Sequence, residues 1–260
     1  MLTARFCQVL PGSARFWLTS TARRLAEIAG PVKMRALVLF CGTGSVDRAL
    51  ERAGFEVVSV DLEPKFNPTH VADILTWDYK QYSKGHFQFI WASPCCTHFS
   101  RARTTAKTPR DLEGACALVA RTLEIIDYFA SCPFAFENPQ TGLLKEQAVV
   151  QGIPYSDVSY CKYGYAYKKA TRIWHNLGDA WQPKPVCSRA HPCKHYEAFR
   201  AHPATAQRGP GRKQGVLMAG DRCSLEQLYS IPAELCDEIA NAALRANGGD
   251  PPEVGGQAGL

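Results

Sequence analysis

The sequence predicts an α/β protein built on a parallel, doubly wound sheet. From Met34 onward, short apolar runs of strand length alternate with segments of helical periodicity. That alternation is typical of a sheet covered by helices on both faces. In addition, residues able to do chemistry follow several of the predicted strands directly, at the edge where parallel sheets bind their ligands.

Each element has its own local signal. The apolar runs predict strands at residues 35–40, 55–60, 87–92 and 134–136. A helix is expected at residues 45–53, where Gly54 ends it, and another after Asp111, a helix N-cap followed by apolar residues at helical spacing. A last helix is expected at residues 232–244.

The bulk composition excludes several classes of protein. The chain has 260 residues, 46% of them hydrophobic and 21% charged, which is ordinary for a globular domain. We expect no transmembrane helix, because no apolar run approaches the roughly 18 residues that one needs. The net charge of +6 favours an anionic partner. Eleven cysteines without small-loop spacing predict a reducing, intracellular protein rather than a disulfide framework.

Changes in composition divide the chain into five segments. Residues 1–33 are basic, which suits either an organelle transit peptide or an ordinary N-terminal extension. Residues 34–176 carry the α/β pattern. Residues 177–220 form a small irregular lobe rich in Pro, His and basic residues, residues 221–246 contain a helix that returns to the α/β domain, and residues 247–260 have the composition of a flexible tail.

A glycine-rich turn and an acid indicate a nucleoside cofactor. The turn after the first strand reads FCGTG, and Asp61 ends the second strand, where such folds bind ribose hydroxyls. A tight turn without a ligand, and a solvated loop acid at Asp73, are the alternatives. The candidate cofactor contacts are Phe40, Gly42, Gly44, Asp61, Leu62, Asp73, Ile74 and Pro94.

Two further strand ends carry groups suited to catalysis. The segment IWASPCCTHFS places Cys95 and Cys96 in a loop just past a strand, before a run of basic residues, and nearby cations favour a thiolate nucleophile. A structural cysteine pair in a basic loop is the alternative. Glu137 and Asn138 follow the next strand, and a partly desolvated carboxyl there is able to donate a hydrogen bond when protonated.

In order along the chain, these segments resemble the DNA cytosine-5 methyltransferase family, in particular its compact phage, viral and microbial members. The matching segments are FCGTG, Asp61, Asp73–Ile74, SPCCTHFS, FENP, YCKYGYAYKKATRIW and LYSIPAELCDEIA, which cover most of residues 34–244. The resemblance implies a Rossmann-like sheet that binds S-adenosylmethionine, with residues 34–176 as the catalytic domain. The lobe at residues 177–220 stands where the family keeps its target-recognition region.

The resemblance also implies a mechanism. A cysteine attacks C6 of a flipped-out cytosine, Glu137 holds the ring, and C5 is methylated, with Asn138 in the same motif and Arg172 contacting the base. Counting back from Phe99-Ser100 makes Cys96 the nucleophile, whereas counting forward from Pro94 makes it Cys95. The chain departs from the family in having Cys95 in place of a proline and ENP in place of ENV.

Nucleic acid is the expected partner. The candidate contacts are Ser100, Arg101, Arg103, Lys169 and Arg208, with Lys169 standing in for an arginine of the family that falls on Ala170 here. Residues 230–232 are expected to complete the cofactor pocket. DNA is favoured as substrate. A tRNA methyltransferase is the first alternative, although the Cys-Phe-Thr signature of such relatives is missing. A catalytically inactive nucleic-acid-binding homologue is the second.

The small lobe concentrates metal-ligand residue types. Cys187, Cys193, His195 and His202 fall within sixteen residues, and two thiolates with two imidazoles would make a tetrahedral zinc site. The spacing fits no standard finger. The alternative is a basic loop whose exposed histidines touch phosphate.

Overall fold

The computed structural model describes residues 33–104, 106–129, 132–204 and 225–250. The chain divides into two units, residues 1–33 and residues 34–260, and every element below belongs to the second. Within the described residues, none of the helices combines the length and the apolar character needed to cross a lipid bilayer.

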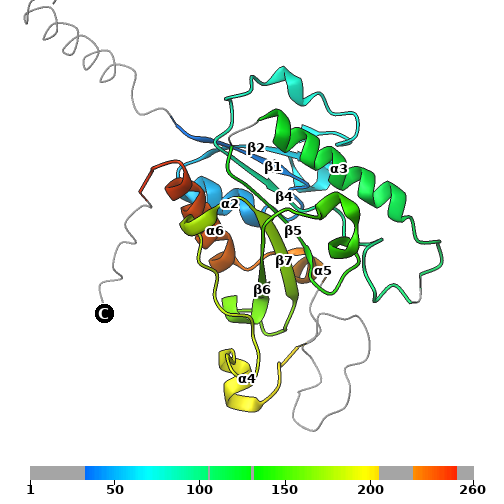
Figure 1. Cartoon of the computed structure of the whole chain (residues 1–260), viewed down its shortest axis with the longest axis vertical. Helices are drawn as coiled ribbons and strands as arrows, with labels where there is room; N and C mark the ends of the chain where they lie inside the picture. The colour runs from blue at the N-terminus through cyan, green and yellow to red at the C-terminus, as the bar shows by residue number, and fades with distance from the viewer. Residues whose placement is uncertain (1–32, 105, 130–131, 205–224, 251–260) are drawn as a thin grey trace, which may run out of the picture. The chain divides into compact units, whose positions relative to one another are not determined.

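A seven-stranded mixed sheet forms the centre of the second unit (Figure 1). Its spatial order is β3-β2-β1-β4-β5-β7-β6. The neighbours from β3 to β5 pair in parallel, whereas β7 runs antiparallel to both β5 and β6. The strands are β1 (Arg35–Leu39), β2 (Glu56–Asp61), β3 (His70–Val71), β4 (Phe89–Ala92), β5 (Phe134–Pro139), β6 (Tyr155–Ser159) and β7 (Ala170–His175).

Helices cover both faces of this sheet. One core joins residues of α2 and α6 to the sheet, and a second core joins residues of α3 to the opposite face. The helices are α2 (Ser45–Arg52), α3 (Leu112–Tyr128), α4 (Lys194–Phe199), α5 (Leu225–Tyr229) and α6 (Ala233–Ala246). The 3-10 turns are η1 (Pro64–Phe66), η2 (Tyr79–Gln81), η3 (Leu144–Glu146), η4 (Ala148–Val150), η5 (Tyr160–Tyr163) and η6 (Gly178–Ala180). The predicted Rossmann-like α/β class is therefore confirmed.

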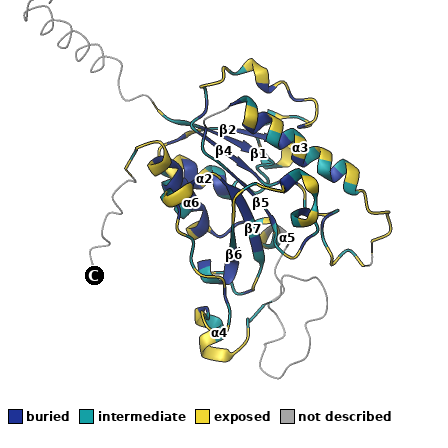
Figure 2. Ribbon diagram, in the orientation of Figure 1, coloured by how far each residue is buried: buried dark blue, intermediate teal, exposed yellow. Residues whose placement is uncertain are grey.

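Local sequence explains the elements that position the site. The central strands are continuous apolar runs because both of their faces are buried, as Figure 2 shows. The Asp111 side chain accepts the Gly114 N–H at 2.8 Å and caps α3, as predicted. The strands at β1, β2, β4 and β5 and the helices α2, α3 and α6 match their predicted positions to within a few residues.

The β6–β7 hairpin is the main addition to the predicted sheet. The basic segment YCKYGYAYKKATRIW leads into β7, which lies between β5 and β6. β6 reads YSDVS and has no apolar run, so no local signal revealed it. The insertion matters because Asn138 pairs directly with Arg172 across β5 and β7.

Candidate active site

The turn after β1 has an unusual backbone. Phe40, Gly42 and Gly44 all have positive φ, at 57°, 50° and 69°. This region suits glycine and is strained for an aromatic residue such as Phe40. The Gly42 N–H donates to Asp61 Oδ2 at 2.9 Å, so the glycine turn is tied to the end of β2. The predicted cofactor turn and its acid therefore lie side by side.

The Asp61 carboxylate is held from two sides. Besides the bond from Gly42, its Oδ1 accepts the Glu63 N–H at 2.9 Å. A carboxylate has about four acceptor positions, so capacity remains for the hydroxyls of a ligand. The neighbouring Leu62 side chain is 64% exposed and offers an apolar surface beside the acid.

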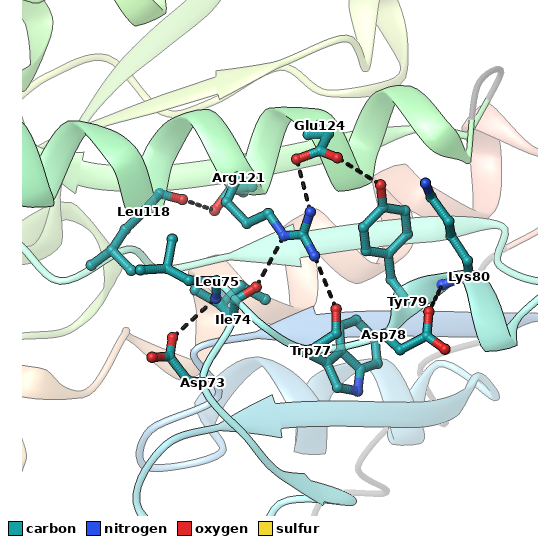
Figure 3. Close-up of polar contacts among 11 residues, drawn as sticks. Asp73, Ile74, Leu75, Trp77, Asp78, Tyr79, Lys80, Leu118, Arg121 and Glu124 are labelled. Carbon is teal, nitrogen blue, oxygen red and sulfur yellow. Dashed lines mark hydrogen bonds and ion pairs between the residues drawn. The ribbon is translucent and has the colours of Figure 1, made fainter.

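The loop containing Asp73 and Ile74 is held by helix α3. Arg121 donates from Nε to the Ile74 carbonyl at 3.1 Å and from Nη2 to the Trp77 carbonyl at 3.0 Å (Figure 3). Its Nη1 also pairs with Glu124 at 2.9 Å. The Ile74 side chain is buried, whereas the Asp73 carboxylate accepts a hydrogen bond from the Leu75 N–H within its own loop. Sequence reasoning missed Arg121, because a cation within a helix gives no sign of what it contacts.

The segment before α6 reaches the glycine turn, as expected for residues 230–232. The Ile231 N–H donates to the hydroxyl of Ser45, the first residue of α2, at 3.3 Å. The Ser230 hydroxyl and the Tyr165 phenol lie 2.5 Å apart. Pro232 is the N-cap of α6.

The two adjacent cysteines occupy different environments. Cys95 is exposed, and its thiol donates to Thr97 Oγ1 at 3.3 Å. Burial, followed by the negative charge of Glu137, raises the pKa of Cys96 to about 11, and the ammonium of Lys169 acts to lower it. Cys96 thus lies within electrostatic reach of both charged groups.

Glu137 and Lys169 are half-buried, like Cys96, and lie within electrostatic reach of it. Burial raises the pKa of Glu137, and Lys169 opposes that shift. Within the described part of the chain, Glu137 Oε2 is a buried oxygen without a hydrogen-bond partner, as a group awaiting a ligand would be. Lys169 donates to the Leu228 carbonyl at 3.2 Å, and its Nζ lies 4.8 Å from the centre of the Tyr160 ring.

Two contacts join the cysteine loop to the end of β5. Asn138, fully buried, donates from Nδ2 to the Pro94 carbonyl at 2.9 Å. The Leu143 N–H donates to the Phe99 carbonyl at 2.8 Å. Gly142 permits this approach, because a Cβ there would lie 3.0 Å from the Pro139 carbonyl oxygen and 3.3 Å from that of Phe99.

Arg172 is not brought to this group. Its guanidinium forms two hydrogen bonds with Asp157, at 2.7 and 2.8 Å, and lies 3.5 Å from the centre of the Tyr155 ring. Arg172 pairs with Asn138 across the strands, so it projects from the face of the sheet opposite to that of Glu137. A contact from Arg172 to the base stays a prediction.

The basic residues that follow Cys96 form hydrogen bonds and an ion pair within the protein. Arg101 pairs with Glu146 at 2.5 Å, and Arg103 donates to the Thr108 carbonyl at 2.8 Å. Arg110 donates to the carbonyls of His98 and Ser100, the latter at 3.0 Å. Arg101 remains 58% exposed, so it can still contact an anionic partner.

Some predictions fall on residues outside the described part of the chain. These are the N-terminal extension up to residue 32, residues 205–220 of the predicted lobe with Arg208, residues 221–224 of the following segment, and residues 251–260 of the predicted tail.

The cluster of metal-ligand types differs from the predicted set in one member. Cys187, Cys193 and His202 lie together, but the fourth member is Cys161 and not His195. One ligand atom from each of the four lies within 4.8 Å of the others. The prediction used proximity in sequence, which kept His195 in the set and missed Cys161, because Cys161 belongs to η5 and reaches the lobe only through the fold.

The chain was compared with known proteins. No protein-family model matches it. It is 36% identical, over 199 residues, to a probable DNA (cytosine-5)-methyltransferase of Frog virus 3 (isolate Goorha), a match that covers 69% of this chain and 90% of the viral protein.

Solved structures with some likeness include two methyltransferases. The Dnmt2 methyltransferase of S. pombe is 19% identical, with a TM-score of 0.38, and the match covers 55% of this chain and 50% of that one. The Entamoeba histolytica methyltransferase EhMeth is 15% identical, with a TM-score of 0.43 and coverages of 58% and 56%. The chain thus spans about half the length of these two structures.

Proposed function

The chain belongs to the DNA (cytosine-5)-methyltransferase family, and we propose that it methylates C5 of cytosine in DNA through a covalent bond from Cys96 to C6 of the base. One observation carries the proposal: Cys96, Glu137 and Lys169, from three separate segments, are partly buried and lie within electrostatic reach of one another, with Glu137 Oε2 buried. The name of the viral relative and the net charge of +6 favour DNA as the substrate.

The edge of the sheet at the glycine turn fits S-adenosylmethionine. A Cβ added at Gly42 would find its nearest heavy atom, the Phe40 oxygen, 3.9 Å away, so a ligand can approach the backbone closely. The remaining lone pairs of Asp61 suit ribose hydroxyls, and the exposed Leu62 suits the face of an adenine ring. When bound, S-adenosylmethionine supplies an electrophilic methyl group.

Cys96 acts as the nucleophile of this mechanism. The target base must leave the helical stack before any side chain can reach its C6 atom. The pKa of the Cys96 thiol is raised to about 11, so the thiolate has to be generated within the site. The ammonium of Lys169 lowers the cost of that ionisation.

Glu137 binds and polarises the base. Its raised pKa favours the protonated carboxyl, which can donate to N3 of cytosine while its other oxygen accepts from the exocyclic amine. A hydrogen bond at N3 draws electrons from the ring and makes C6 more electrophilic. In its neutral form Glu137 also no longer opposes the thiolate of Cys96.

In the proposed reaction, each bond that forms is matched by one that breaks. The thiolate forms a bond to C6, and the electron pair of the C5–C6 double bond becomes available at C5. C5 uses that pair to form a bond to the methyl group, and the bond between the methyl carbon and the sulfonium sulfur of S-adenosylmethionine would break, its electron pair going to sulfur. A base then removes the C5 proton, the double bond re-forms, and Cys96 departs as thiolate.

Covalent trapping tests this proposal. The full chain is incubated with S-adenosylmethionine and duplex DNA that contains 5-fluorocytosine, whose fluorine cannot leave as a proton does. We expect a denaturant-resistant adduct for the wild type and for Cys95→Ser, and none for Cys96→Ser. Loss of the adduct in Cys95→Ser alone would move the nucleophile to Cys95.

Methyl transfer from labelled S-adenosylmethionine to mixed duplex DNA and to total RNA, followed by nucleoside digestion, tests the substrate. Label in 5-methyldeoxycytidine supports DNA, whereas label in the RNA pool alone supports the tRNA alternative. No adduct and no label, together with a shift on a native gel, supports an inactive nucleic-acid-binding protein.

A further inference from the structure

We propose that Cys161, Cys187, Cys193 and His202 bind a zinc ion in a closed tetrahedral site. Each residue offers one ligand atom, and the four atoms lie within 4.8 Å of one another. Three thiolates and one imidazole are a ligand set that zinc commonly takes in structural sites. Three of the ligands come from the lobe that carries α4, and the fourth, Cys161, comes from η5, so the site is independent of the proposed methyltransferase chemistry.

The distances within the cluster match those around zinc. With Zn–S about 2.3 Å and Zn–N about 2.0–2.1 Å, a tetrahedral ion places sulfur and nitrogen ligands about 3.5 Å apart. His202 Nε2 lies 3.6 Å from Cys187 Sγ and 3.4 Å from Cys193 Sγ. The imidazole is therefore already at the separation that a shared ion requires, and the same nitrogen faces both sulfurs.

The surroundings suit a structural rather than a catalytic metal. All three cysteines are buried, and the four protein ligands leave no open coordination position. The Tyr196 N–H donates to Cys193 Sγ at 3.4 Å, as backbone amides do to metal-bound thiolates.

Nearby lysines balance the charge of the site. Three thiolates and a divalent ion carry one net negative charge. Lys168 donates to the Cys187 carbonyl at 2.7 Å, and Lys162 donates to the Pro192 carbonyl at 3.0 Å, so two cations lie next to the cluster.

An ion would stabilise the part of the lobe around α4, where the described residues 185–204 have little apolar core of their own. The buried cluster that these residues share with Cys161 consists of the three cysteines, with Tyr196 packed against it, and much of α4 is exposed (Figure 2). A metal supplies the cohesion that apolar burial does not. Cys161 follows Tyr160 directly in η5, and the Tyr160 ring contacts the ammonium of Lys169. The ion would therefore also link the lobe to the segment that positions Lys169.

Metal analysis of the purified full chain tests the proposal. We expect a single zinc ion per chain in the wild type and in the matched control His195→Ala, and no retained zinc in Cys161→Ser or His202→Ala. Cobalt substitution should produce the visible absorption bands of a tetrahedral thiolate site in the wild type and in the control.

A second measurement keeps the test valid if the ligand variants do not fold. In native wild-type protein, a chelator should make the three cluster thiols newly reactive towards a thiol reagent, and added zinc should protect them again. The proposal is wrong if the wild type holds no zinc, if Cys161→Ser keeps its zinc while His195→Ala loses it, or if mass spectrometry finds two of the cysteines in a disulfide.

Discussion

Replacing Gly142 by alanine should disturb the active site without touching any reacting group. The new Cβ would lie 3.0 Å from the Pro139 carbonyl oxygen and 3.3 Å from that of Phe99. Both oxygens belong to the backbone, so they cannot rotate away, and the two loops have to separate by a few tenths of an ångström. Phe99 also donates its N–H to the Cys96 carbonyl at 3.1 Å, so the shift reaches the nucleophile.

The expected magnitude follows from this crowding. Inserting one methyl group into a tight contact costs about 1–3 kcal/mol. For a domain of this size, each kcal/mol lowers Tm by about 2–4 °C. Because a displacement of about 1 Å can cost about a hundredfold in rate, a shift of a few tenths should slow adduct formation about three- to tenfold.

Gly85→Ala is the matched control. A Cβ at Gly85 would meet no atom within 4 Å, and its φ lies outside the positive region. This variant should keep the wild-type rate and a similar or slightly higher Tm, since alanine restricts the unfolded chain. Thermal unfolding and the rate of trapping on 5-fluorocytosine DNA measure both effects. If Gly142→Ala matches Gly85→Ala in both, the reasoning about the two loops is refuted.

Three further substitutions test other parts of the structure. Lys169→Met should slow adduct formation by a similar factor at pH 7 and at pH 9, because it removes the cation that lowers the pKa of Cys96 and both pH values lie well below that pKa of about 11; an unchanged rate at both pH values would contradict this. Arg121→Met should raise KM for S-adenosylmethionine by up to about thirtyfold with little change in kcat, since two hydrogen bonds of about 1 kcal/mol each hold the loop of Asp73 and Ile74, whereas Glu124→Gln should leave KM near wild type. Asp47→Asn should stabilise the fold at pH 8 by about 1–3 kcal/mol, because burial raises the pKa of Asp47 from 3.8 to about 6 and its ionised form opposes folding. That gain should shrink as the pH falls through 6 and vanish below about 4, which thermal unfolding across this pH range will measure.

Much of the site was predictable because its residues follow strands. The glycine turn, Asp61, the cysteine loop and Glu137 each come directly after an apolar run. Carboxyl ends of parallel strands meet at one edge of a sheet, so a correct strand assignment places these residues together without any knowledge of their contacts.

Other parts of the site gave no local signal. Arg121 reaches two carbonyls from within a helix, and the chain between β5 and α6 contains an antiparallel hairpin whose strand β6 lacks an apolar run. The resemblance to the family named both Lys169 and Arg172, but only the tertiary structure shows that Lys169 lies within electrostatic reach of Cys96 while Arg172 pairs with Asp157.

The sequence by itself thus determined the class of the fold, the order of the reactive segments and most of their residue types. These properties follow from periodicity, turn chemistry and strand ends, which act over a few residues. The tertiary structure decided which distant residues meet: Lys169 with Glu137 and Cys96, and Cys161 with the cysteines of the lobe. Such tertiary contacts depend on strand order, register and loop packing, which arise from the whole chain and produce no local sequence pattern in any one segment.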